Sequence, residues 1–257
     1  AEYVILSDCY HVCNIDYKEL LKQHKEKQAD ITCAYHECMV CRDDYMPINR
    51  FVVDENERVV EMEVLPIFSG KANMSMDIWV MKKDLLEKLI DEAILTNYRS
   101  FNRDILSKNL NNLKIFGYRF SGYFGNISSL QSYYNVNKNL LKKEIRDEIF
   151  YQPGRSIYTK VRDSAPTRYG VDSKVVNSLI ADGCIIEGEV HNSIIFRGTK
   201  VGKGAIIKDS ILMQDTMISA GKHLEYVITD KNVIIKSKKE LVGNAEYPIY
   251  VKKGGIL

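Results

Sequence analysis

A recurring pair of apolar residues in the second half of the chain most constrains its fold. The pairs lie about six residues apart, or a multiple of six, with small or polar residues between them. They are Leu179-Ile180, Ile185-Ile186, Ile194-Ile195, Ile206-Ile207, Leu212-Met213, Met217-Ile218, Val227-Ile228 and Val233-Ile234. This period is typical of a parallel β-helix, in which each flat side is one short strand and small residues form the corners. An antiparallel sheet explains single pairs but not their recurrence. We therefore predict a parallel β-helix from about residue 170 to 240.

Residues 1–150 have the pattern of a mixed α/β domain. Apolar runs predict strands at residues 3–6, 31–35, 76–81 and 115–120, and a hairpin at 51–62. Amphipathic spacing predicts helices at residues 16–27, 83–95 and 128–141, the first of them capped by Asp16. The first two strands and the helix between them would form a βαβ-like unit. Proline and glycine in residues 150–168 indicate a connector, so we predict two domains, residues 1–150 and residues 151–257.

The composition excludes several classes of protein. The chain has 257 residues and a net charge of +2, which gives no electrostatic footprint for nucleic acid or an anionic membrane. No apolar run approaches the ~20 residues of a membrane span, and no signal-peptide pattern is present. The six cysteines lack disulfide-framework spacing, and the C-x-x-C at Cys38 and Cys41 has no second pair to complete a zinc site. We expect reduced thiols in apolar positions and a cytoplasmic protein.

The stretch Ser7 to Tyr17, S-D-C-Y-H-V-C-N-I-D-Y, follows the first predicted strand. Many nucleotide-handling α/β proteins place a metal-binding carboxylate in such a turn. Here the turn contains Asp8, and the next carboxylate is Asp16. The stretch is either an active metal site or the remains of one.

An α/β half joined to a hexapeptide β-helix resembles the sugar-nucleotide pyrophosphorylases, and the local sequences resemble ADP-glucose pyrophosphorylase (glucose-1-phosphate adenylyltransferase) of glycogen biosynthesis. The family segments L-S-G-D-H-I-Y-K-M-D-Y, F-E-E-K-P, S-M-G-I-Y-I-F, D-F-G-K-D-I and W-R-D-V-G-T-I are similar to residues 7–17, 61–66, 75–81, 100–105 and 121–127. The resemblance implies a partial nucleotidyltransferase domain with a Rossmann-like mixed sheet, followed by a left-handed parallel β-helix. Since the chain has no match to the family's ATP-binding loop, G-G-x-G-x-R-L, we expect an N-terminally truncated fragment.

The resemblance puts tyrosines where the family has two magnesium-binding aspartates. The first position, aligned backwards from Asp16, is Tyr10, and the second is Tyr123. A phenol is neutral at pH 7 and binds a hard cation poorly, so we expect no catalytic residue and no bound cofactor in this chain. The family reaction itself needs Mg²⁺. Asp8 is a weak candidate for a replacement metal ligand.

The family's sugar-phosphate contacts are also changed. Leu65 stands where the family has a lysine that contacts the sugar phosphate, and Asp77 replaces a glycine and adds negative charge. Ser75 matches the family's sugar-contacting serine. Arg103 and Asp104 are either substrate contacts or a structural pair. The candidate substrate-binding residues are therefore Ser75, Asp77, Arg103 and Asp104.

These substitutions resemble the GlgD-type subunit, which is non-catalytic or weakly catalytic and accompanies a catalytic GlgC-type subunit. We expect a regulatory subunit with that catalytic partner, in a hetero- or homotetramer, and the resemblance also implies a phosphorylated allosteric effector. One alternative is an active adenylyltransferase in which Asp8 or another carboxylate replaces the missing ligands. A remote alternative is a hexapeptide-repeat acyltransferase with His191 or His223 as general base.

Overall fold

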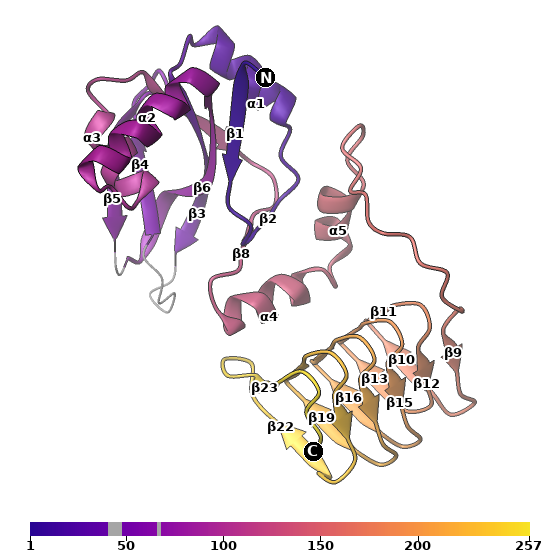
Figure 1. Cartoon of the computed structure of the whole chain (residues 1–257). Helices are drawn as coiled ribbons and strands as arrows, with labels where there is room; N and C mark the ends of the chain where they lie inside the picture. Colours follow the sequence, from indigo (N-terminus) through magenta and orange to yellow (C-terminus); the bar gives the residue numbers. More distant parts are fainter. Residues whose placement is uncertain (41–47, 66–67) are drawn as a thin grey trace. The chain divides into compact units, whose positions relative to one another are not determined.

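The chain divides into two compact units, residues 1–128 and residues 129–257, in a computed structural model (Figure 1). The structure describes residues 1–40, 48–65 and 68–257. Within this described part, no helix is long and apolar enough to cross a membrane.

A mixed six-stranded sheet is the centre of the first unit. Its strand order is β5-β4-β6-β3-β7, and β1 also pairs with β6. The strands are β1 (Tyr3–Ser7), β3 (Ile31–Val40), β4 (Ile48–Val53), β5 (Val59–Leu65), β6 (Gly70–Lys82) and β7 (Ile115–Phe120). A separate ribbon pairs β2 (His11–Val12) with β8 (Gly125–Asn126). The predicted strands are all present, and the predicted hairpin is β4 with β5.

Strand β6 lies between the two strands of the predicted βαβ-like unit. β1 and β3 run in the same direction, but each pairs antiparallel with β6 rather than with the other. The sequence therefore indicated the direction of the two strands correctly and missed the strand inserted between them. Residue spacing along the chain could not reveal it, because β6 begins thirty residues after β3 ends.

Helices cover both faces of this sheet. α1 (Tyr17–Glu26) begins after Asp16, whose carboxylate accepts the backbone N–H of Lys18 at 2.9 Å, as predicted. Its Leu20 packs on one face with Ile15, Ala34, Met76, Ile78 and Val80. α2 (Lys83–Thr96) and the π-helical segment η1 (Phe101–Leu106), which continues into α3 (Ser107–Asn109), cover Trp79 and Met81 on the other face. Since successive strand residues point to opposite faces, β6 is buried on both.

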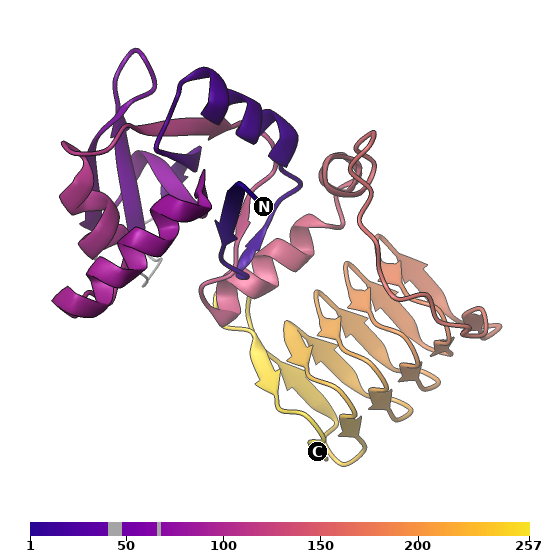
Figure 2. The same ribbon diagram turned by 45° about the horizontal axis from the view of Figure 1, so that its top comes forward.

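The second unit is a three-sided parallel β-helix, which confirms the fold predicted from the six-residue period (Figures 1 and 2). One sheet consists of β9 (Arg168–Tyr169), β12 (Ile185–Ile186), β15 (Lys200–Val201), β18 (Met217–Ile218) and β21 (Ile234–Ile235). The second consists of β10 (Lys174–Val176), β13 (Glu189–His191), β16 (Ile206–Lys208), β19 (His223–Glu225) and β22 (Glu240–Val242). The third consists of β11 (Leu179–Ile180), β14 (Ile194–Ile195), β17 (Ile211–Leu212), β20 (Val227–Thr229) and β23 (Ile249–Val251). Its left-handed sense stays a prediction.

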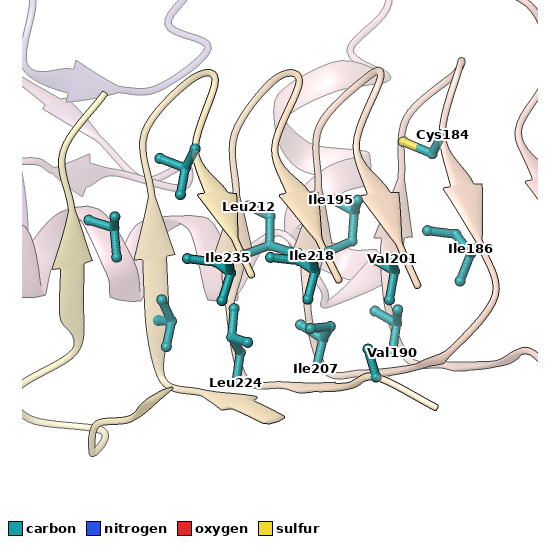
Figure 3. Close-up of a cluster of buried hydrophobic side chains, with 14 residues drawn as sticks. Cys184, Ile186, Val190, Ile195, Val201, Ile207, Leu212, Ile218, Leu224 and Ile235 are labelled. Atoms are coloured by element: carbon teal, nitrogen blue, oxygen red, sulfur yellow. The ribbon is translucent and has the colours of Figure 1, made fainter. Parts of the chain in front are cut away.

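Apolar side chains stack in register inside this coil. Ile186, Val201, Ile218 and Ile235 face one another across successive coils of the first sheet (Figure 3). All four are almost fully buried. Burying such a side chain contributes about 1.5–3 kcal/mol, so the coils stabilise one another only when stacked.

A ladder of serines joins successive coils at one corner. The hydroxyl of Ser193 donates to the carbonyl of His191 and accepts the backbone N–H of Ser210 from the next coil at 3.0 Å. Ser210 repeats the pattern with the carbonyl of Lys208 and the N–H of Val227. Each hydroxyl thus joins a carbonyl of its own coil to a backbone N–H of the next coil, and both carbonyls also accept a backbone N–H from Asp209 or Tyr226.

The residues before these serines turn the corner in the left-handed backbone region. Asn177, Asn192 and Asp209 have φ values of 44°, 49° and 43°, which asparagine and aspartate tolerate best after glycine. Tyr226 occupies the same corner in the next coil with a φ of 52°. A bulky residue is uncommon there, and its ring packs beside Tyr134 with centroids 6.4 Å apart.

Helix α4 (Leu130–Asn139) packs on the outside of the β-helix and belongs to the second unit. Its Tyr134 is buried against Ile211 and Ile228, and the phenol donates to the carbonyl of Asp209 at 2.7 Å. α5 (Lys143–Phe150) follows it. The sequence placed the domain boundary near residue 150, whereas the contacts divide the chain between residues 128 and 129. Sequence reasoning cannot show which surface an amphipathic helix covers.

We expect Ser210→Ala to lower the free energy of unfolding by about 1–3 kcal/mol. The substitution removes the acceptor of the Val227 N–H and one of the two donors to the Lys208 carbonyl, which keeps the Tyr226 N–H. Chemical denaturation of the variant measures the loss. Ser237→Ala, at an exposed serine of the same unit, is the matched control, and an equal effect in both variants would contradict the ladder's role.

A second prediction concerns the unit boundary. Residues 129–257 should fold alone with a higher melting temperature than residues 151–257, because the shorter piece exposes Ile211 and Ile228 to water. Thermal unfolding followed by circular dichroism compares the two pieces. Equal stability would show that α4 contributes nothing to the β-helix.

Candidate functional site

A cavity of about 490 Å³ lies in the first unit, beside the β2–β8 ribbon. Its walls come from the end of β3, the middle of β6, the β2–β8 ribbon and the residues flanking it, among them Tyr10, His11, Ser75, Asp77 and Asn126. The cavity therefore lies where the turn after the first strand meets the strand that carries Asp77.

The carboxylate of Asp77 is the most connected group in this cavity. Only 4% of the residue is exposed. Tyr10 donates its phenolic hydrogen to Asp77 Oδ2 at 2.6 Å, and the Ser75 hydroxyl donates to Oδ1 at 2.9 Å. The amides of Asn102 and Asn49 also donate to Oδ1, at 2.9 Å and 3.4 Å. A buried charge held by four neutral donors is stabilised without a cation.

The backbone at Asp77 explains why a glycine fits this position in the resembling family. Its φ is 48°, in the left-handed region, where a residue with a Cβ carries a steric cost. Its N–H bonds to Ser75 Oγ at 3.0 Å, and its carbonyl accepts the N–H of Asp8 at 3.2 Å. Aspartate tolerates this conformation better than most residues, so the turn persists with a charged side chain in place of hydrogen.

Tyr10 is held as a neutral phenol. Burial raises the pKa of its hydroxyl above the ordinary value, and the carboxylates of Asp77 and Asp8 raise that pKa further. Asp8, the weak metal candidate, thus lies next to Tyr10 and acts on the same hydroxyl. A phenol that donates to a carboxylate cannot at the same time offer an anionic oxygen to a metal ion.

His11 lies beside Tyr10 in the same wall. Its ring lies between those of Tyr10 and Phe124, tilted against each, with centroid distances of 4.3 Å and 4.8 Å. Burial lowers the pKa of His11, so the imidazole is neutral at pH 7. His36 contributes from β3, and its Nδ1 bonds to the carbonyl of Phe120 at 2.9 Å. Neither histidine was singled out from the sequence as part of this cavity.

The structure brings only some of the predicted site residues together. Tyr10, Ser75 and Asp77 line the cavity, with Asp8 next to Tyr10. Leu65 and Tyr123 are half-buried and are not among the residues that line it. The roles assigned to Leu65 and Tyr123 therefore stay predictions from the resemblance.

Arg103 and Asp104 form a local structural pair outside the cavity wall. Asp104 accepts the backbone N–H groups of Arg99 and Ser100, each at 3.0 Å. Its ion pair with Arg103, at 3.1 Å, and these backbone bonds hold the pKa of the Asp104 carboxyl below its usual range. The structural interpretation accounts for both residues, and their substrate role stays a prediction.

Sequence reasoning missed Asn102 and Asn126. Asn102 lies in the segment similar to D-F-G-K-D-I, one residue before Arg103, and Asn126 lies in the segment similar to W-R-D-V-G-T-I. Neither asparagine replaces a charged residue that the resemblance singles out. Attention to their amide side chains could have found both.

The described residues contain no group of three or more histidine, cysteine, aspartate or glutamate side chains arranged to hold a metal ion. None of the five described cysteines is in a disulfide, and Cys33 and Cys184 are buried as expected, whereas Cys9 is exposed. Cys41 of the C-x-x-C and Pro66 of the segment similar to F-E-E-K-P lie outside the described residues.

Comparison with known proteins defines the family. The family model "GlmU-like, C-terminal hexapeptide" matches residues 163–247. Glycogen biosynthesis protein GlgD of Bacillus subtilis (strain 168) is 34% identical over 253 residues, which cover 98% of this chain and 63% of that protein. The chain is similar to the ADP-glucose pyrophosphorylase family. The family resemblance read from the sequence is thereby confirmed.

Two further relatives carry the enzyme's name. Glucose-1-phosphate adenylyltransferase of Clostridium perfringens (strain SM101 / Type A) is 34% identical over 84% of this chain and 56% of its own length. Glucose-1-phosphate adenylyltransferase of Desulfitobacterium hafniense (strain Y51) is 29% identical over 92% of this chain and 59% of its own length. The chain thus spans between 56% and 63% of the length of these three relatives.

The left-handed backbone at Asp77 predicts a difference between two substitutions. Asp77→Gly and Asp77→Ala both remove the carboxylate, but only alanine keeps the cost of a Cβ in this conformation. We expect the glycine variant to be more stable than the alanine variant by about 1 kcal/mol. Chemical denaturation of the pair measures the difference. A more stable alanine variant would mean that the backbone relaxes out of the left-handed region.

Proposed function

We propose that this chain is part of a regulatory, non-catalytic subunit of glucose-1-phosphate adenylyltransferase in glycogen biosynthesis. The observation that carries the proposal is the hydrogen bond from Tyr10 to Asp77 at 2.6 Å. Tyr10 stands where the family alignment expects a magnesium-binding aspartate, and its proton is committed to a neighbouring carboxylate. The 34% identity to the Bacillus subtilis GlgD protein supports the same assignment.

The family's magnesium ion does not fit the side chains around Tyr10. The phenol is kept neutral by burial and by two carboxylates, so it offers a hard cation no negative oxygen. The Asp77 carboxylate is already occupied by four donors. We therefore derive no metal-assisted step for this chain.

The electrostatics of the cavity also oppose the substrate of the reaction. Asp77 brings a negative charge to the wall where the family has glycine, and Leu65, which does not line the cavity, stands where the resemblance places the family's lysine. A dianionic sugar phosphate would meet a carboxylate and lack its cationic partner. Both substitutions support a subunit that does not carry out adenylyl transfer.

A subunit of this kind acts through a partner. We propose association with a catalytic GlgC-type subunit in a cytoplasmic tetramer, and regulation of that subunit by a phosphorylated effector. The β-helix offers flat outer faces for such contacts, with Val176 and Val242 exposed on its second sheet. His191 and His223 lie on the same sheet, each beside a glutamate of its own strand, which gives a structural role for these residues without acyl transfer.

An activity assay tests the proposal. The full-length protein alone should form ADP-glucose from ATP and glucose 1-phosphate no faster than a blank, whereas adding it to the catalytic subunit should change that subunit's kcat or its response to effectors. If the protein alone, purified free of the catalytic subunit, forms ADP-glucose at the rate of that subunit, the alternative of an active enzyme that uses Asp8 or another carboxylate holds.

Restoring the family residues should restore part of the chemistry. In the full-length protein, Tyr10→Asp with Tyr123→Asp should produce Mg²⁺ binding measurable by calorimetry, with little catalysis. Adding Leu65→Lys and Asp77→Gly should raise ADP-glucose synthesis by about 100-fold or more, because a close charge contact is worth a few kcal/mol and each ~1.4 kcal/mol is tenfold in rate.

Two control variants accompany this series. Tyr10→Phe with Tyr123→Phe removes both hydroxyls without adding a carboxylate and should leave Mg²⁺ binding at background. Val64→Lys, at an exposed neighbour of Leu65, adds the same charge outside the proposed contact. Equal gains from Val64→Lys and Leu65→Lys would contradict the role assigned to position 65.

A further inference from the structure

The cavity around Asp77 has the size of a small-molecule site but not the charge of a phosphate site. Its volume of about 490 Å³ lies within the range of roughly 300–1,000 Å³ that is usual for ligand pockets. Among the described residues that line it there is no lysine or arginine. Its fixed charge is the carboxylate of Asp77, with that of Asp8 next to Tyr10.

Two residues that line the cavity each have a buried acceptor atom without a hydrogen-bond donor. His11 Nδ1 is one of them, and Asn126 Oδ1 is the other. His11 also bonds to the carbonyl of Met76, so Nε2 is the ring nitrogen that donates there. In the neutral ring, Nδ1 then carries a lone pair. The two residues are directly opposite each other in the β2–β8 ribbon.

Such a wall favours a ligand that brings donors. Buried acceptors without a partner are costly and are rare in native proteins, so a ligand that reaches them gains affinity. Sugar hydroxyls supply these donors, whereas a phosphate dianion supplies only acceptors and is repelled by Asp77. Phe124 adds an apolar ring between His11 and His36, with centroids 4.8 Å and 5.4 Å away.

We infer that this cavity binds an uncharged sugar through its hydroxyl groups and discriminates against sugar phosphates. The inference rests on the proposed function, since it assigns a sensing role to a site that does not carry out catalysis. The chemical class of the ligand is a neutral hexose or the end of a glucan chain. Its binding would report the supply of unphosphorylated sugar to the catalytic subunit.

Ligand binding to the full-length protein tests the inference. Saturation-transfer NMR and calorimetry are run with D-glucose, maltose and glucose 1-phosphate as separate probes. We expect glucose or maltose to bind at least tenfold more tightly than glucose 1-phosphate. Tighter binding of glucose 1-phosphate, or no binding of either neutral sugar, would overturn the inference.

Two variants locate the binding site. His11→Phe keeps a ring between Tyr10 and Phe124 but removes Nδ1, and should weaken neutral-sugar binding about 2- to 10-fold, the value of one hydrogen bond. His191→Phe, on the β-helix, is the matched control and should bind as the unmodified protein does. Unchanged binding in His11→Phe contradicts the assignment.

A second variant tests whether the charge of Asp77 causes the preference for neutral sugars over glucose 1-phosphate. Asp77→Asn removes the carboxylate with little change in shape and should reduce the discrimination against glucose 1-phosphate at least tenfold. Asp91→Asn, at an exposed position of α2, makes the same charge change away from the cavity and should leave the preference intact. If Asp77→Asn fails to fold, the His11→Phe comparison still decides.

The outcome is distinguishable from failure of the proposed function. A protein that changes the activity of the catalytic subunit but binds neither neutral sugar would disprove only the ligand assignment. A protein that forms ADP-glucose on its own would disprove the regulatory role, whatever it binds.

Discussion

The first unit depends on β6 being hydrogen-bonded along both edges and buried on both faces. β1, β3 and β4 all pair with this strand, and its alternating side chains contribute to two separate hydrophobic clusters. Ser75 and Asp77 belong to this strand, so the cavity is built on the most constrained backbone of the unit. A site on such a strand holds its geometry even when its chemistry changes.

This constraint explains how the cavity keeps its shape while its side chains differ from those of the resembling family. Tyr10, Ser75, Asn49 and Asn102 come from separate segments and converge on one carboxylate. The donors compensate the buried charge of Asp77, so no metal ion or lysine is required for stability. These hydrogen bonds hold the side chains of the wall to one another.

How much the sequence predicted varied with the range of the interaction. The period of apolar pairs predicted the β-helix, and the Asp16 cap predicted the start of α1, because both depend on neighbouring residues. The insertion of β6 between β1 and β3, and the packing of α4 on Ile211 and Ile228, depend on contacts far apart in the chain. In the site, substitutions of charged residues were visible from the resemblance, whereas the roles of Asn49 and Asn102 as donors to Asp77 depend on the fold, which brings their amides to that carboxylate.

The left-handed backbone at Asp77 also has an evolutionary meaning. Glycine and aspartate codons differ by a single base, and both residues adopt this conformation without rebuilding the strand. A single base change can therefore exchange glycine, which leaves room for a phosphate, for aspartate, which repels one, while the fold stays the same. Position 77 can therefore gain or lose a buried carboxylate while the path of the strand stays the same.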